Sequence, residues 1–144
     1  LSNGFIQSGL AATIVESLTL IHGLPIVLLI VIVALGVSLA TEVTSNTAIA
    51  AVMMPIMAAT AISVGVNPIV LMMTAAVCAS MAFMFPVATP PNAVAYGSGY
   101  ISARDLLRSG WVLDLIGVGI WMVCLYTIVL WAIGVPLDLP AWAH

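Results

Sequence analysis

The scarcity of charge restricts this chain to one kind of environment. Only 5% of its residues are charged and 64% are hydrophobic, with a mean hydropathy of +1.31. A soluble domain carries about 25% charged residues, so this chain could not keep a water-exposed surface in solution. The composition therefore predicts an integral membrane protein that has the lipid bilayer as its surroundings.

The remaining polar chemistry argues against several other functions. Arg104 and Arg108 are the only Lys or Arg residues, and two arginines do not make a nucleic-acid surface. Cys78 and Cys124 stand singly in apolar runs, which indicates small buried hydrophobic residues and neither a disulfide nor a metal site. Because no catalytic constellation or metal-binding spacing is recognisable, no enzyme is predicted.

The alternation of apolar and polar stretches divides the chain into four segments. The first has apolar residues at helical intervals of three and four, which is typical of a helix at the membrane interface. The next two are apolar runs that break at polar residues, and the last ends in a run long enough to span the about 30 Å of a bilayer core. These segments are an amphipathic interfacial helix at 1–23, a hairpin at 24–67 with its tip at 44–47, a broken transmembrane helix at 68–101 with its loop at 88–92, and a loop with a final transmembrane helix at 102–144.

A polar island interrupts the second segment. It follows directly on the strongly apolar run at 25–40, which is shorter than the about 20 residues that cross a bilayer. The chain there is either one interrupted helix or a re-entrant hairpin whose arms enter from the same side, and the short flanking runs favour the hairpin. Non-helical backbone at membrane depth must be shielded by protein or line a cavity, so either geometry makes the island a candidate site. Its residues are Thr41, Glu42, Thr44, Ser45, Asn46 and Thr47.

A second polar knot breaks the third segment. Pro90 and Pro91 cannot continue a helix, because proline has a fixed φ and no N–H. Thr89 is the predicted N-cap of a new half-helix with Pro90 at its first position. We expect that half-helix to end around 97–99, where the sequence reads Gly-Ser-Gly.

Two broken helices in one chain offer complementary chemistry without basic side chains. The N-termini of new half-helices present N–H donors to an anion, while unwound carbonyls and hydroxyl or amide oxygens are ligands for a small cation. Such a site suits Na⁺ together with a carboxylate. The plain alternative is structural, since Ser and Thr can bond to their own helix and Pro kinks occur in membrane helices. Two knots, each with Asn beside hydroxyl residues, favour a site.

Two acidic residues lie near these features. Glu42 stands beside the tip, where a carboxylate in the membrane needs a partner or water. It either binds a cation directly or holds the tip in shape as a hydrogen-bond acceptor, and the second role is favoured. Asp114 lies early in the final span and is expected near the membrane interface, without a functional role.

The two knots together resemble a known family. "TSNTA" at 44–48 and "FMFPVATPPNAVAYGSGYI" at 83–101 are similar to the C-terminal half of the divalent anion:sodium symporters, which carry di- and tricarboxylates or sulfate. The resemblance runs over nearly the whole chain. It implies an all-α integral membrane protein containing one inverted repeat, made of an interfacial helix, a re-entrant helical hairpin, a broken transmembrane helix and a final transmembrane helix.

The resemblance also implies which residues form the site. In the family, the Ser-Asn-Thr tip touches both Na⁺ and substrate, and the broken-helix loop completes the site. Substrate contacts are implied for Ser45, Asn46, Thr47, Thr89 and Pro90. Sodium ligands are implied for Ser45, Asn46, Thr47, Ala88, Thr89 and Asn92, with Glu42 and Thr44 supporting the tip. No cofactor is implied, and Na⁺ is the coupling ion.

The function implied by the resemblance is sodium-coupled transport of di- or tricarboxylates or similar dianions, by alternating access of the elevator type in a homodimer. One repeat holds only half of such a site, so we expect this chain to be the C-terminal half of a symporter, with the N-terminal repeat as its partner. A related sulfate or arsenite carrier and a small structural membrane protein are the alternatives. The positive-inside rule places the loop at 102–110 in the cytoplasm of an inner or plasma membrane and the C-terminus outside.

Overall fold

The computed structural model describes residues 25–140. The interfacial helix predicted at 1–23 lies outside the described residues. Within them the regular structure is helical except for one isolated antiparallel bridge between Val66 and Asp138, so the prediction of an all-α chain is confirmed. The helices are α3 (Ile26–Thr41), α4 (Asn46–Ser63), α5 (Pro68–Cys78), α6 (Pro90–Gly97), α7 (Ala103–Cys124) and the π-helical segment η2 (Leu125–Ala132).

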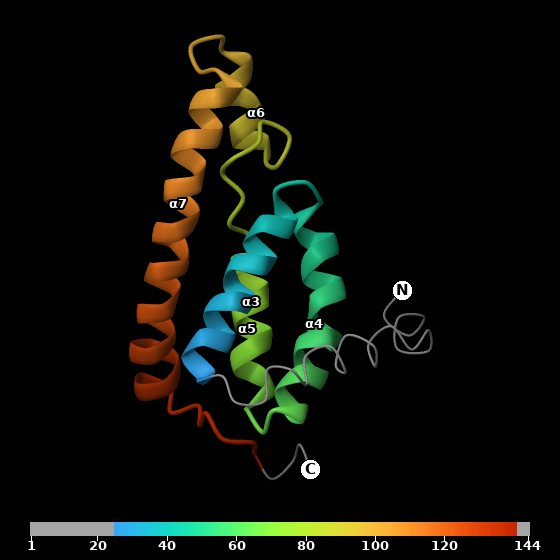
Figure 1. Ribbon diagram of the computed structural model, residues 1–144, viewed down its shortest axis with the longest axis vertical. Helices are drawn as coiled ribbons and strands as arrows, with labels where there is room; N and C mark the ends of the chain where they lie inside the picture. Colours follow the sequence, from blue (N-terminus) through green and yellow to red (C-terminus); the bar gives the residue numbers. More distant parts are fainter. Residues whose placement is uncertain (1–24, 141–144) are drawn as a thin grey trace.

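Helices α3 and α4 form a hairpin around α5. The two arms meet at a short turn at 42–45, and α5 packs against both of them (Figure 1). The arms need no polar face, because their apolar residues are either buried against α5 or left for an apolar environment. The core of the hairpin consists of Ile30, Ala34 and Val37 from α3, Ile56, Met57 and Ala61 from α4, and Val70, Leu71, Ala75 and Cys78 from α5.

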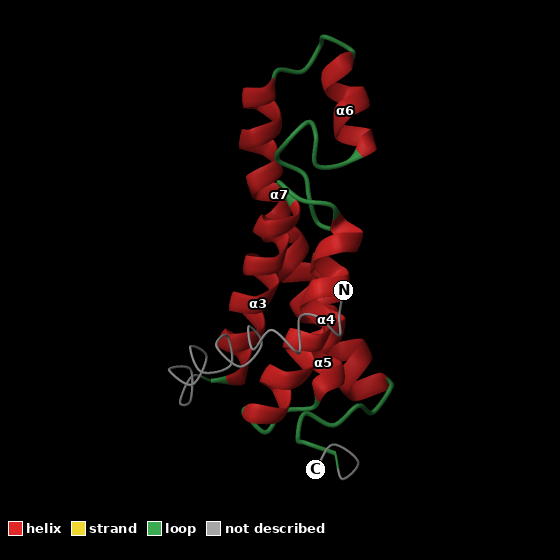
Figure 2. Cartoon of the chain, turned by 90° about the vertical axis from the view of Figure 1, so that its right-hand side faces the viewer, coloured by secondary structure: helices red, strands yellow, loops and turns green. Residues whose placement is uncertain are grey.

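The third predicted segment breaks earlier than the sequence indicated. We expected a loop at 88–92, but α5 ends at Cys78 and the chain is irregular up to Thr89 (Figure 2). The prediction was wrong because the residues after Cys78 are as apolar as those before it, while their backbone groups are bonded to α3. The following half-helix α6 begins at Pro90 with Thr89 as its N-cap, as predicted.

The last helix also begins earlier than predicted. Residues 102–110 were expected to form a charged loop before a span starting at Trp111, but α7 begins at Ala103. A capping box starts it there: Ser102 Oγ accepts from the Asp105 N–H (3.2 Å), and the Ser102 N–H donates to Asp105 Oδ2 (3.1 Å). Two described helical stretches are long and apolar enough to cross a membrane, at 46–63 and 103–132.

The end of the described chain returns to the base of the hairpin. After η2 the chain turns at Gly134, whose φ of +74° favours glycine. The N–H and side-chain amide of Asn67 then donate to the carbonyls of Leu137 (2.8 Å) and Pro136 (3.0 Å). Asn67 Oδ1 also accepts from the N–H of Ile69 (3.1 Å), so one buried side chain caps α5 and holds the tail.

Helix α7 packs closely against the irregular segment, residues 79–89, at Gly110. A Cβ atom on Gly110 would lie 2.5 Å from the Phe83 carbonyl oxygen and 2.6 Å from Met84 Cα. These contacts are with backbone atoms, which cannot move aside as a flexible side chain can. The absence of a side chain at 110 is therefore a condition for the packing of α7 on the irregular segment.

We predict that Gly110→Ala destabilises the protein by about 1–3 kcal/mol, because the added methyl group overpacks this contact. Gly119 lies on the same helix, and a Cβ atom there would have no neighbour within 4 Å. Gly119→Ala is therefore the matched control and should leave stability unchanged or slightly raised. Thermal unfolding of the full-length protein in detergent checks this. Equal Tm values for the two variants would contradict the close approach.

Candidate functional site

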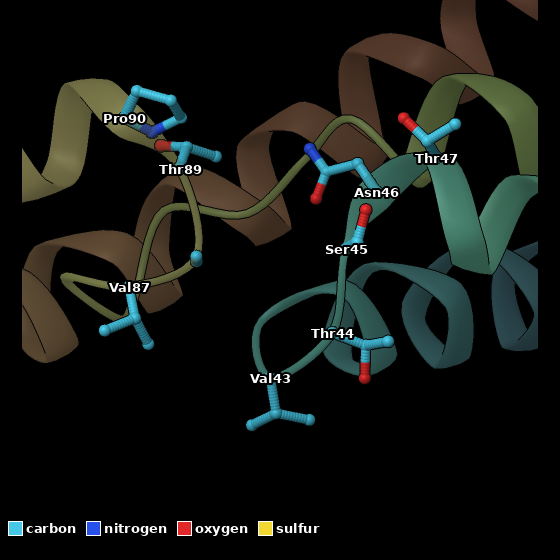
Figure 3. Close-up of a pocket in the computed structure, with 9 residues that line it drawn as sticks. Val43, Thr44, Ser45, Asn46, Thr47, Val87, Thr89 and Pro90 are labelled. Carbon is cyan, nitrogen blue, oxygen red and sulfur yellow. The ribbon is translucent and has the colours of Figure 1, made fainter.

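The hairpin tip and the end of the irregular segment face each other across a cavity (Figure 3). Its volume is about 540 Å³. The two sides come from segments forty or more residues apart in the sequence, and both were singled out there as polar interruptions of apolar runs. The lining consists of Val43, Thr44, Ser45, Asn46 and Thr47 from the tip, and Val87, Ala88, Thr89 and Pro90 from the irregular segment.

The tip side presents the N-terminus of α4. Ser45 is the N-cap, but its side chain makes no capping hydrogen bond, and the first turn contains no acidic residue. The first helical N–H groups have no partner inside the helix and remain available as donors, and the positive end of the helix dipole is not neutralised. Asn46 Oδ1 is buried without a hydrogen-bond partner in the described part of the chain, so this oxygen can accept a hydrogen bond or act as a cation ligand.

The opposite side presents the N-terminus of α6. Thr89 is its N-cap, and the Thr89 side chain makes no capping hydrogen bond either. Pro90 and Pro91 fill the first two helical positions, so this end offers fewer N–H donors than α4 does. The oxygen atoms that this side can offer are the Thr89 hydroxyl and the backbone carbonyls of the lining residues, Ala88 among them.

Asn92 is not among the residues that line the cavity. Its side-chain amide donates to the carbonyls of Ala82 (3.1 Å) and Phe85 (3.0 Å). Both acceptors lie in the irregular segment, so Asn92 ties α6 back onto the chain that leads into it. Of the residues implied as sodium ligands, Asn92 is the one that the structure keeps away from the cavity wall.

Glu42 lies behind the tip and bonds to the irregular segment. It is 1% exposed. Its Oε1 accepts from the N–H groups of Phe83 (2.7 Å) and Met84 (3.0 Å), and its Oε2 accepts from those of Met84 (3.0 Å) and Phe85 (3.0 Å). This geometry favours the role of a holding acceptor over that of a direct cation ligand, because both oxygens are already occupied.

Two hydroxyl groups on α3 complete this attachment. Ser38 Oγ and Thr41 Oγ1 lie 3.1 Å and 3.2 Å from the carbonyl oxygen of Met81. The single hydroxyl hydrogen of Ser38 is shared between this carbonyl and Asp114 Oδ1, at 3.2 Å. Thr41 was singled out in the sequence as part of the polar island, whereas Ser38 was not recognised. The signal was present in their spacing, since Ser38, Thr41 and Glu42 recur at intervals of three and four and so share one face of α3.

Asp114, which was expected near the membrane interface and without a functional role, is buried against the hairpin. The side chain is 2% exposed, and Oδ1 accepts from Ser38 Oγ (3.2 Å). It sits on the same side of α7 as Gly110, one turn further along, and thus faces the hairpin. The close packing that Gly110 permits brings Asp114 inside, which the position of Asp114 in an apolar run could not reveal.

The arrangement offers opposite partial charges within one cavity. The N-termini of α4 and α6 are positive ends that suit an anion. Hydroxyl, amide and carbonyl oxygens of Ser45, Asn46, Ala88 and Thr89 are hard ligands that suit a small cation such as Na⁺. None of the lining residues carries a charge, so a ligand pair of opposite charge fits the cavity better than either ion alone.

We predict that Glu42→Gln destabilises the protein by about 1–3 kcal/mol, because a side-chain NH₂ group leaves one or more buried backbone N–H donors without an acceptor. Hydrogen exchange of the peptide that covers 79–89 should accelerate in the full-length variant. Asp138→Asn, at an exposed carboxylate, is the control. Unchanged exchange at 83–85 in Glu42→Gln would show that the bonds do not hold this segment.

The whole chain can be compared with known proteins. It is 36% identical over 140 residues to the sodium-dependent dicarboxylate transporter SdcS of Staphylococcus saprophyticus and 39% identical over 140 residues to SdcS of Staphylococcus aureus strain MRSA252. Each alignment covers 97% of this chain and 27% of the relative. The chain thus spans about a quarter of the length of these curated relatives, which are transporters and not enzymes.

A family model also matches nearly the full length of this chain. The model of the sodium:sulfate symporter transmembrane region matches residues 1–135. That range contains the hairpin, the irregular segment, α6 and α7 with η2, and so includes every residue that lines the cavity. The chain therefore belongs to the sodium:sulfate symporter family.

Proposed function

We propose that this chain supplies one half of the binding site of a sodium-coupled secondary transporter for di- or tricarboxylates or similar dianions. The observation that carries the proposal is the cavity in which the Ser45–Thr47 tip faces Ala88–Pro90. The relatives named as sodium-dependent dicarboxylate transporters support the choice of ions.

In this proposal, Na⁺ binds between the tip and the irregular segment. Asn46 Oδ1 is the leading ligand, since it is the buried oxygen that lacks a partner. The hydroxyls of Ser45, Thr47 and Thr89 and the carbonyl of Ala88 supply further oxygens, and none of them carries a charge that a membrane would penalise. Asn92 contributes by holding the irregular segment, and Glu42 by fixing that segment to α3.

The substrate carboxylate binds at the N-terminus of α4. Three features suit an anion there: the free N–H groups of the first turn, the positive helix end and the absence of an acidic residue in that turn. Pro90 and Val87 form an apolar part of the wall that can contact the carbon chain of a dicarboxylate. Since no basic side chain lines the cavity, we expect bound Na⁺ to supply the balancing charge.

The complete transporter requires more chain than the half site described above. We propose that a preceding inverted repeat supplies the second half of the site, that two such proteins form a homodimer, and that the binding domain moves as an elevator. In this arrangement the N-terminal end of α7, which carries Arg104 and Arg108, lies on the cytoplasmic side of the inner or plasma membrane and the C-terminus lies outside.

Uptake of labelled succinate by the full-length protein, measured with and without Na⁺, tests this function. We expect uptake to require Na⁺ and to fall about tenfold or more in Ser45→Ala/Asn46→Ala, because a lost ligand to a charged group costs about 1.5–3 kcal/mol. Unlabelled sulfate as competitor distinguishes the two anions that the family description and the relatives name.

The matched control is Ser98→Ala/Thr127→Ala. Both hydroxyls bond to carbonyls of their own helical turn and lie outside the cavity, at Ala95 (2.6 Å) and Val123 (2.7 Å). The control should transport like the unmodified protein. Uptake that ignores Na⁺, or that survives the double substitution at the tip, would refute the assignment of the site.

A further inference from the structure

Two acidic side chains meet in the interior behind the cavity. The carboxyl of Asp114 on α7 lies against that of Glu42 at the end of α3, and the two are 2% and 1% exposed. Ser38 stands one helical turn before Glu42 and donates to Asp114 Oδ1 (3.2 Å), which independently places Asp114 beside this face of α3. The other oxygen, Asp114 Oδ2, is buried without a partner in the described part of the chain.

The hydrogen bonds of Glu42 identify it as the ionised member of the pair. Its two oxygens accept from three backbone N–H groups, with that of Met84 shared between them, which leaves one of the about four acceptor positions of the carboxylate for a further donor. A carboxylate with several N–H donors is strongly favoured in its charged form. Glu42 therefore keeps the negative charge.

Within residues 25–140, no cationic side chain lies near Asp114 to compensate a second negative charge there. Helix α3 contributes no charged residue besides Glu42 at its end, the irregular segment contributes none, and α5 contributes only the buried thiol of Cys78. On α7 itself, Arg104, Asp105 and Arg108 are exposed and lie more than one turn away. Two touching carboxylates in a low-dielectric interior repel each other strongly, so only one of them can be ionised.

We propose that Asp114 and Glu42 form a proton-binding site, in which Asp114 is a neutral carboxylic acid and donates the hydrogen on Oδ2 to the Glu42 carboxylate. Oδ1 remains the carbonyl oxygen of the acid and accepts from Ser38. This one proton satisfies the buried oxygen that otherwise has no partner. The proton also joins α7 to the end of α3, where Glu42 holds the irregular segment.

The proton therefore lies between α7 and the end of α3, behind the cavity. Neither Asp114 nor Glu42 lines the cavity or is a proposed Na⁺ ligand. Loss of the proton would place two negative charges in contact and push α7 away from α3, which would loosen the contact of Gly110 with the backbone of Phe83 and Met84. The protonation of Asp114 can be measured without Na⁺ or substrate, so it can be tested separately from the proposed transport.

Infrared difference spectroscopy of the full-length protein at neutral pH tests the site. The spectrum of the unmodified protein minus that of Asp114→Asn should contain the C=O stretching band of a protonated carboxylic acid, and the band should shift in D₂O. Asp105→Asn, at an exposed carboxylate, is the matched control and should remove no such band. Thermal unfolding shows that the variants compared are folded.

Ser38→Ala provides a second measurement that does not remove either acid. Without the Ser38 hydrogen bond to Oδ1, the C=O band of Asp114 should move to higher frequency while its intensity stays the same. The proposal is overturned if folded Asp114→Asn keeps every carboxylic acid band of the unmodified protein. It is also overturned if Ser38→Ala leaves that region of the spectrum unchanged. Neither result depends on whether the protein transports succinate, so failure here is distinguishable from failure of the proposed function.

Discussion

The hydrogen bonds between Glu42 and three consecutive backbone N–H groups are the interaction on which the site depends. A segment that leaves its helix inside a membrane protein must find partners for every N–H and carbonyl, because lipid offers none. Glu42 supplies the acceptors for Phe83, Met84 and Phe85, and hydroxyls on α3 supply donors for Met81. The end of α3 thus replaces the helical turn that the segment gives up.

This use of Glu42 leaves the cavity free of fixed charge. The carboxylate lies at the C-terminal end of α3, where the helix dipole disfavours an anion, and the bonds from 83–85 offset that cost together with the cost of burial. Because the Glu42 carboxylate is hydrogen-bonded to the backbone at 83–85, behind the tip, it does not neutralise the positive ends of α4 and α6. They remain directed at whatever enters the cavity.

The parts of this architecture that sequence reasoning found are those with a local signal. Polar residues inside apolar runs marked the tip, and Thr89 followed by two prolines marked the start of α6 at Pro90. The parts that it missed depend on partners far away in the chain. Residues 79–85 read as a continuing helix because Glu42, whose carboxylate accepts from the N–H groups at 83–85, lies 41 residues before Phe83. The burial of Asp114 was missed because its hydrogen bond comes from Ser38 on α3. The hydrogen bonds that tie Asn92 to the carbonyls of Ala82 and Phe85 could not be known before the break was located.

The irregular segment is held from two sides, which determines how the cavity can respond to ligands. Glu42 fixes it to α3, while Gly110 lets α7 press on the same residues, Phe83 and Met84. The tip follows directly after Glu42, so both walls of the cavity are attached to the same packed helices. An anion that enters meets only the partial charges of helix ends, and a cation meets only neutral oxygens. Under the proposed function, a bound Na⁺ and a bound carboxylate balance each other's charge, because the lining residues carry none.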